Sequence, residues 1–132
     1  MIVADAGWII ALRDPKDAHH EVAVDSNRRL GTEAAILPAV TFAECLVGPA
    51  KLGLLEKAAR DLRAAFEIHE ADRDSPMRWA SLRASTGLRL PDVIVLEAAV
   101  HREARGIATF DDRLASCSID RGFEVVGPEV IS

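Results

Sequence analysis

Four acidic residues stand beside short apolar segments of this chain, at Asp5, Glu44, Asp92 and Asp111. Carboxylates that lie within a few ångströms of each other repel, and such a cluster stays ionised in a crevice only with a counter-cation. Sites that offer oxygen ligands alone select Mg²⁺, or Mn²⁺ in its place, over zinc. If the four acids converge, the sequence therefore predicts a site for one or two magnesium ions.

The chemistry that fits such a site is metal-assisted hydrolysis of a phosphodiester bond. A bound metal ion activates a water molecule as the nucleophile and stabilises charge on the scissile phosphate and the leaving oxygen. A carboxylate that is not fully engaged by metal could orient or deprotonate this water. No side-chain nucleophile is needed, and the sequence contains neither a phosphate-cradling glycine loop nor a Gly-x-Ser-x-Gly motif.

One stretch of chain is expected to bring two of these acids to the same end of the molecule. A helix that starts near Asp92 and stops at Gly106 spans roughly 20 Å at about 1.5 Å per residue, and the strand after it returns by about 15 Å. Pro91 suits the first turn of a helix, where its missing N–H needs no partner, and glycine is common just past a helix end. Asp92 and Asp111 are therefore predicted to lie at one edge.

Short apolar strands that alternate with helices predict an α/β domain with a mostly parallel central sheet flanked by helices. The predicted strands are Ile2–Ala4, Ala34–Leu37, Glu67–Glu70, Ile107–Thr109 and Phe123–Val126. The predicted helices are Trp8–Leu12, Ala18–Leu30, Thr41–Val47, Ala50–Phe66, Met77–Thr86, Asp92 to Gly106, and Asp112–Cys117. The carboxyl ends of parallel strands share one edge, where sites form, so we expect all four acids there.

Three details of this scheme concern helix faces and helix ends. Val22 is predicted to point inward from the helix that contains it, because it falls on the apolar side of that helix. Gly48 and Pro49 are predicted to break the chain between two helices. Leu52 and Leu55 then begin an apolar stripe on the second of these helices, which indicates core packing.

Length and composition indicate one small domain. With 132 residues and 49% hydrophobic content, the chain can bury one core but not two ordinary ones. No run of about 18 apolar residues occurs, and no basic segment precedes the first strand, so we expect no membrane span and no signal peptide. Cys45 and Cys117 lie far apart and outside any zinc spacing, which favours free thiols and a cytoplasmic protein.

The net charge of −5 is unusual for a nucleic-acid-binding protein. The chain has 21 acidic and 16 basic residues, however, so outside the four clustered acids the two signs nearly balance. Global acidity therefore does not exclude a nucleic-acid substrate. Basic residues close in sequence to the acids are candidates for contacts with a nucleic-acid backbone, namely Arg13, Lys16, Arg89 and Arg113.

Asp5 after an apolar strand, Thr41-Phe42-Ala43-Glu44, Leu90-Pro91-Asp92, and Thr109-Phe110-Asp111 occur in this order over nearly the whole chain. Together they resemble the PIN-domain family, most closely its VapC-type toxins. The resemblance implies a single PIN-like nuclease domain over residues 1–132 that acts as a Mg²⁺-dependent endoribonuclease toxin, paired with a small VapB-type antitoxin and commonly dimeric. It assigns Asp5, Glu44, Asp92 and Asp111 as catalytic metal ligands, Thr109 as a supporting hydroxyl, and Asp112 as a candidate outer ligand.

The chain departs from the family pattern at two places. Many relatives carry Ser or Thr within two residues of the first Asp, where this chain has Ala6 and Gly7, so one supporting hydroxyl is missing. Glu97 stands where relatives often have a small residue. At about 100° per residue it points some 140° away from Asp92 on the helix, and we expect it at the surface beside His101.

Several histidines, tryptophans and acidic residues of the sequence admit other interpretations. His19 and His20 are adjacent on a predicted helix and point about 100° apart, which favours a solvated face over a metal site. Trp8 and Trp79 lie in apolar helical contexts that indicate core packing, and a single Asp at a strand end is often a helix cap. A phosphoaspartyl enzyme would usually need a lysine late in the chain, and none follows Lys57. A non-catalytic PIN-fold binding module and a housekeeping RNA-processing nuclease stay open as alternatives.

Overall fold

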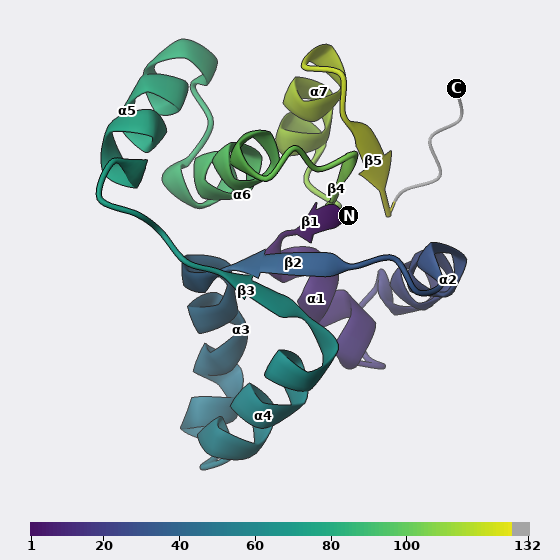
Figure 1. Cartoon of the computed structure of the whole chain (residues 1–132). Helices are drawn as coiled ribbons and strands as arrows, with labels where there is room; N and C mark the ends of the chain where they lie inside the picture. Colours follow the sequence, from purple (N-terminus) through teal and green to yellow (C-terminus); the bar gives the residue numbers. More distant parts are fainter. Residues whose placement is uncertain (128–132) are drawn as a thin grey trace.

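The computed structural model describes residues 1–127 and has a parallel sheet at its centre (Figure 1). In this part of the chain the sheet has five strands in the order β3-β2-β1-β4-β5, and every neighbouring pair is parallel. The strands are β1 (Ile2–Ala4), β2 (Ala35–Pro38), β3 (Glu67–His69), β4 (Gly106–Ala108) and β5 (Glu124–Val126). The predicted α/β class and the parallel sheet are confirmed.

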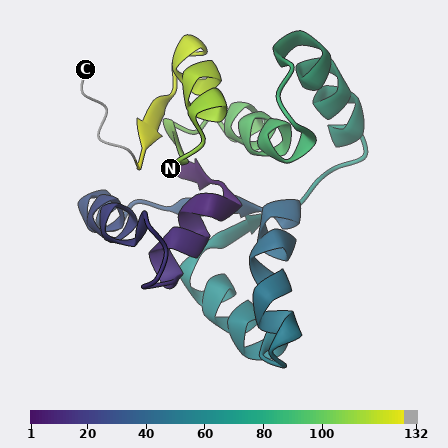
Figure 2. The same cartoon turned by 180° about the vertical axis from the view of Figure 1, so that it is seen from behind.

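Helices cover both faces of this sheet. They are α1 (Ala6–Arg13), α2 (His20–Leu30), α3 (Ala39–Lys51), α4 (Leu55–Ala65), α5 (Ser75–Thr86), α6 (Leu90–His101) and α7 (Asp112–Asp120). Figures 1 and 2 show α5, α6 and α7 on one side of the sheet and α1 to α4 on the other. Among residues 1–127 no helix is both long enough and apolar enough to cross a membrane.

Alternation along the central strand divides the core into two clusters. Val3 packs with the side chains of α6 in one cluster, whereas Ile2 and Ala4 pack with Trp8 and the side chains of α3 in the other. Successive side chains of a strand point to opposite faces, so β1 is buried on both sides. Since β1 pairs with β2 on one edge and β4 on the other, the residue after β1 lies at the middle of the sheet edge.

The predicted end of the helix that carries Asp92 is wrong. This helix, α6, ends at His101, and the chain turns through Glu103 with a φ of 54° before β4 begins at Gly106. A Cβ atom at position 106 would lie 2.8 Å from the backbone oxygen of Glu124. Glycine is therefore needed here because β5 approaches closely, and the general direction of the chain is still the predicted one.

The predicted break at Gly48 and Pro49 is also wrong. Both residues lie within α3, which continues to Lys51. Pro49 has no N–H to donate to the carbonyl of Cys45, and α3 tolerates the loss of this one hydrogen bond close to its end. The turn instead forms at Gly53, whose φ is 72°. Leu52 and Leu55 consequently leave the core and are 76% and 46% exposed.

The helix that contains Val22 also packs differently from the prediction. It starts at His20 and buries Ala23 and Ser26, so Val22 is 38% exposed. Its packing partner is Trp8, whose ring N–H donates to the Ser26 hydroxyl at 3.2 Å. The burial of Trp8 confirms its predicted core role. The remaining predicted elements are present with ends shifted by roughly one to four residues.

Candidate active site

The four predicted acids line one cleft at the carboxyl edge of the sheet, which we call the acidic cleft. Its volume is about 310 Å³. Asp5 directly follows β1, and Asp111 comes two residues after Thr109, the first residue beyond β4. Glu44 comes from α3 and Asp92 from α6. In open parallel sheets a crevice forms between two neighbouring strands whose following connections run in opposite directions. Here these strands are β1, which leads to β2, and β4, which leads to β5 on the other side.

Asp5 and Asp111 are joined through the hydroxyl of Thr109. This hydroxyl donates a hydrogen bond to Asp5 Oδ2 and accepts one from the backbone N–H of Asp111 at 2.9 Å. Thr109 is fully buried and Asp5 is 8% exposed. The pairing of β1 with β4 places both residues at adjacent strand ends, so the predicted supporting hydroxyl does contact an acid of the cleft.

Asp5 and Asp111 also cap helices. The backbone N–H of Trp8 donates to Asp5 Oδ1 at 2.8 Å, and that of Leu114 donates to Asp111 Oδ1 at 2.8 Å. A cap uses one carboxylate oxygen to satisfy a free N–H of the first turn. Capping and a position in the cleft are therefore compatible, because the second oxygen of Asp111 is not needed for the cap.

Asp92 enters the cleft from the first turn of α6. It is 8% exposed, and its Oδ2 lies 3.6 Å from Nε of Arg89, the residue just before the helix. Pro91 occupies the first turn of α6 as predicted. Glu44 is more exposed than Asp5 and Asp92 and completes the wall that α3 contributes.

Burial and mutual repulsion make the acids of the cleft harder to ionise. The pKa of Asp5 is raised to about 6, mainly by burial and in smaller part by the charges of Asp92 and Asp111, against the hydrogen bonds from Thr109 and Trp8. Burial also raises the pKa of Asp92, with the charge of Asp111 acting in the same direction. Burial and the charge of Asp92 raise the pKa of Glu44. A cation in the cleft would offset each of these effects.

The donor chemistry of the cleft fits a hard divalent cation, because its acids offer carboxylate oxygens and no thiolate. As the side chains lie, no three His, Cys, Asp or Glu groups between residues 1 and 127 form a ready-made metal ligand set. The four carboxylates line the same cleft, but they do not surround one common position. Asp5, Glu44, Asp92 and Asp111 are the residues that would hold a metal ion there.

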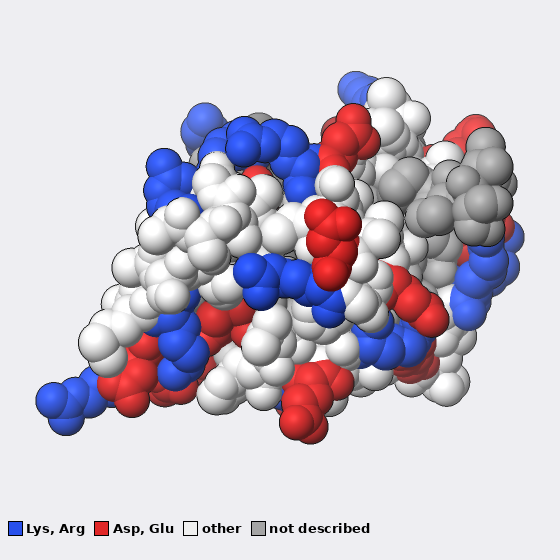
Figure 3. Space-filling view, turned by 90° about the horizontal axis from the view of Figure 1, so that it is seen from above, with Lys and Arg blue, Asp and Glu red and all other residues white. Residues whose placement is uncertain are grey.

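Most of the predicted basic contacts, and the candidate outer ligand, lie outside the acidic cleft. Of the four basic residues only Arg89 lines the acidic cleft. Arg13 lies 3.8 Å from Asp61 in a different groove, Arg113 donates to the Gly87 carbonyl at 3.2 Å, and Asp112 faces a separate hollow beside α7. Lys16 is exposed. Figure 3 shows both charge signs on the face formed by α5, α6 and α7.

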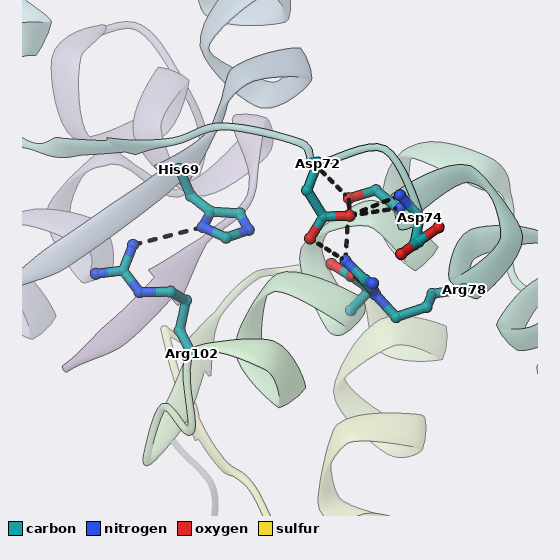
Figure 4. A network of polar contacts seen from close by, with 7 residues as sticks. His69, Asp72, Asp74, Arg78 and Arg102 are labelled. Atoms are coloured by element: carbon teal, nitrogen blue, oxygen red, sulfur yellow. Dashed lines mark hydrogen bonds and ion pairs between the residues drawn. The ribbon is translucent and has the colours of Figure 1, made fainter.

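Glu97 is not the surface residue that the sequence predicts. It is 3% exposed, and Arg78 of α5 donates from Nε to Glu97 Oε1 at 2.5 Å. Arg78 also donates from Nη2 to Asp72 at 2.8 Å, and Figure 4 shows these two side chains pointing toward one another. The prediction failed because α5 packs over this side of α6 and supplies a partner from another element. His101 instead lies 5.7 Å from the ring of His69.

Three polar or aromatic side chains that were not predicted there also line the cleft, those of Asp17, His19 and Phe110. The rings of His19 and Phe110 stack with centroids 4.4 Å apart and planes inclined by 10°. Phe110 lies between Thr109 and Asp111, so its position in the motif was a usable signal. His19 carried no such signal, since its contact with Phe110 depends on how the segment before α2 folds back.

The PIN domain family model matches residues 2–119, a range that includes all four acids. The chain belongs to the PIN domain family. No curated protein matches it. Sixteen chains of solved structures do match.

A toxin–antitoxin complex from Klebsiella pneumoniae is 21% identical over 88% of this chain and 91% of that chain, with a TM-score of 0.74. VapC20 of Mycobacterium tuberculosis, described as a toxin that cleaves the sarcin-ricin loop, is 16% identical over 97% and 100% of the two chains, with a TM-score of 0.76. FitAcB of Neisseria gonorrhoeae is 22% identical over 95% and 96%, with a TM-score of 0.75. At these identities the similarity shows a shared PIN fold.

Proposed function

We propose that this PIN domain is a metal-dependent endoribonuclease and the toxin of a toxin–antitoxin pair. The observation that supports this function best is the convergence of Asp5, Glu44, Asp92 and Asp111, from four elements, on one cleft. The pKa of three of these acids is raised, mainly by burial and in smaller part by the charge of a neighbouring acid. Neighbours of this fold include a toxin that is described as cleaving the sarcin-ricin loop.

The residues of the cleft would hold Mg²⁺, for which Mn²⁺ can substitute. When bound, the metal would activate water and stabilise charge on the phosphate and the leaving oxygen. Thr109 keeps the Asp5 carboxylate turned toward the cleft, and one acid that is not fully engaged orients the attacking water. Arg89, which is exposed beside Asp92, contacts the substrate phosphate in this scheme.

The test is cleavage of a structured RNA by the purified protein in Mg²⁺, in Mn²⁺ and in EDTA. Cleavage should stop in EDTA, and Asp92→Asn should lose activity by orders of magnitude because an amide supplies no anionic ligand. Asp112→Asn is the matched control, since Asp112 is an acid near the same edge that does not line the cleft. Undiminished cleavage in EDTA, or equal losses in both variants, would contradict this mechanism.

An apolar groove next to the cleft supports an antitoxin as the partner. It lies between α1, α3 and α4, has a volume of about 520 Å³, and is lined by Ile10, Leu52 and Leu54 among others. These three side chains are 43%, 76% and 51% exposed. Glu44 lines both the groove and the acidic cleft. A peptide with an apolar helix face that occupies the groove would therefore reach the cleft and block it.

The partner is tested with the protein encoded beside this chain, which should be short and carry a DNA-binding segment if the toxin assignment holds. That protein should inhibit cleavage, and Leu52→Glu in the groove should abolish inhibition while cleavage continues. Inhibition that Leu52→Glu leaves unchanged would place the partner elsewhere. Sedimentation or light scattering of the isolated chain tests the proposed homodimer.

Growth of a bacterial host separates the toxin from the other interpretations. Expression of the wild type in the cytoplasm should arrest growth, and Asp5→Ala should relieve the arrest at an equal soluble level. RNA cleavage without growth arrest would favour a housekeeping RNA-processing nuclease. RNA binding without metal-dependent cleavage would favour a non-catalytic binding module.

A further inference from the structure

The stacked rings of His19 and Phe110 stand at the mouth of the acidic cleft. We propose that this ring pair is a stacking platform for an unpaired base of the RNA, next to the phosphate that is cleaved. This inference rests on the proposed function and specifies which kind of RNA the cleft accepts. Both rings line the cleft together with the acids at positions 5, 44, 92 and 111, so a base on the platform lies beside the site of cleavage.

The two rings are anchored differently, and this leaves one ring face open. Phe110 is half-buried and packs against the core cluster that contains Trp8. His19 is exposed, and its ring covers Phe110 at a centroid distance of 4.4 Å with an inclination of 10°. Because one face of the imidazole rests on Phe110 and the side chain is exposed, the other face is free to receive a flat group.

The backbone beside His19 is held independently of the ring contact. The N–H of His19 donates to Asp17 Oδ1 at 2.8 Å, and Nδ1 of His20 lies 2.7 Å from the carbonyl oxygen of Ala11 in α1. These bonds fix the start of α2 against α1. His19 is therefore presented to the cleft by the scaffold, and its replacement should leave the fold in place.

Charge explains why a stacking contribution is needed at this site. The chain has a net charge of −5, and the cleft gathers acids, which repel the phosphate backbone of RNA. Among the predicted basic contacts only Arg89 lines the cleft. Stacking of bases on aromatic rings does not depend on phosphate charge and tolerates different bases, since every base has a π-face.

The substrate class follows from the geometry of stacking. A base can stack on a protein ring only when it is not paired and stacked within a helix. The cleft should therefore accept RNA whose scissile phosphate lies in a single-stranded segment or a loop. A fully paired RNA of the same sequence should be a poor substrate.

The kinetic test compares His19→Ala with the wild type on a single-stranded RNA. The variant should raise KM by about tenfold, the order expected for one stacked base, with a smaller change in kcat. His19→Trp should restore KM because it rebuilds a flat ring. His101→Ala is the matched control, since His101 is also an exposed histidine beside another ring. An unchanged KM in His19→Ala would overturn the inference while wild-type cleavage preserves the proposed function.

A binding test gives a readout that does not require cleavage. Single-stranded RNA that contains 2-aminopurine is mixed with Asp92→Asn protein, and its fluorescence should fall as the base stacks. The same protein with His19→Ala should lose most of this quenching and His19→Trp should recover it, while the paired RNA should show little. Quenching without any wild-type cleavage would overturn the proposed function alone, and quenching that His19→Ala leaves unchanged would overturn the platform.

Discussion

The hydroxyl of Thr109 donates a hydrogen bond to the carboxylate of Asp5, a residue 104 positions earlier in the chain. The same oxygen accepts from the backbone N–H of Asp111 at 2.9 Å. One side chain thus links the acid that follows β1 to the acid that follows β4. A hydrogen bond to a carboxylate favours its ionised form, so Thr109 partly offsets the burial that raises the pKa of Asp5.

Thr109→Val should therefore raise the pKa of Asp5 and weaken the site. Without the hydroxyl, two buried polar groups lose a partner, which should cost about 1–3 kcal/mol of unfolding free energy. The acid limb of the cleavage rate against pH should also move to higher pH. Thr86→Val is the matched control, because its hydroxyl likewise donates to a carbonyl, of Leu82 at 2.7 Å, and accepts from an N–H, of Leu88 at 3.2 Å. An equal shift of the acid limb in both variants would contradict this role.

The raised pKa of Asp5 makes metal-free stability depend on pH. The folded pKa of about 6 exceeds the ordinary 3.8, so between these values the folded state binds a proton that the unfolded state does not. The contribution of Asp5 to stability should therefore rise as pH falls from 7.5 to 5, by about 1.4 kcal/mol of the roughly 3 kcal/mol that is reached below pH 3.8. His69, whose burial lowers its pKa, acts in the opposite direction over part of this range.

A comparison with Asp5→Asn isolates the contribution of Asp5 from that of His69. Denaturant unfolding in EDTA at pH 5 and pH 7.5 should show a larger gain at low pH for the wild type than for the variant. Asparagine can still cap α1 by accepting from Trp8, so the cap is preserved. Parallel pH dependence in the two proteins would mean that Asp5 is not a buried, repelled carboxylate.

The sequence predicted the positions of Asp5 and Asp111 well, since an acid that comes within a few residues of the end of a buried strand lies near the carboxyl edge of a parallel sheet. The position of Asp92 was predicted from the lengths of a helix and of the strand after it. Asp92 does line the cleft, although the predicted helix end at Gly106 is wrong. These inferences depend on local periodicity and on chain direction, which a sequence carries directly.

Contacts between elements that are far apart in the sequence could not be predicted in this way. The angle of Glu97 on α6 was a sound estimate, but it did not reveal that α5 would cover that side with Arg78. The stacking of His19 on Phe110 depends on the fold of the segment before α2. The exposure of Leu52 depends on a turn at Gly53, four residues after Pro49, where the sequence predicted the break.

The pair of Arg78 and Glu97 should contribute measurably to stability. Arg78→Ala leaves the carboxylate of Glu97, whose side chain is 4% exposed, without its cation. We expect the unfolding free energy to fall by about 2 kcal/mol. This loss is smaller than for a fully buried pair, because the side chain of Arg78 is 36% exposed. Adding Glu97→Gln to Arg78→Ala should recover part of this loss. Arg29→Ala is the control, since it breaks an exposed pair with Asp25 and should change stability by about 0.5 kcal/mol or less. Equal losses from both arginines in chemical denaturation would contradict the prediction.

Gly7→Ser should supply the hydroxyl that this chain lacks near Asp5. A Cβ atom at position 7 would lie 3.7 Å from Asp5 Oδ1, so a serine hydroxyl can reach the carboxylate. The hydrogen bond should lower the pKa of Asp5 and move the acid limb of the cleavage rate to lower pH. Gly7→Ala is the control, because it shares the gain in helix propensity without the hydroxyl. Coincident pH profiles of the serine and alanine variants would show that the hydroxyl does not reach Asp5.

The stability of Asp111→Asn tests, without any substrate, whether the cleft binds a metal ion. In EDTA, Asp111→Asn should be at least as stable as Asp112→Asn, because asparagine can keep the cap on Leu114 while the repulsion of Asp5 and Asp92 is relieved. Both variants remove one charge from the same end of α7, so their comparison cancels the effect of the helix dipole. Asp112 does not line the cleft.

Mg²⁺ should then reverse the order of these two variants. At about a hundred times its dissociation constant, the ion stabilises a folded protein that binds it by about 2.7 kcal/mol. The wild type and Asp112→Asn should gain this amount, and Asp111→Asn should lose most of the gain. Thermal melts of the three proteins in EDTA and in Mg²⁺ measure both effects. If Asp111→Asn melts below Asp112→Asn in EDTA and gains as much from Mg²⁺, then Asp111 caps α7 and holds no metal ion.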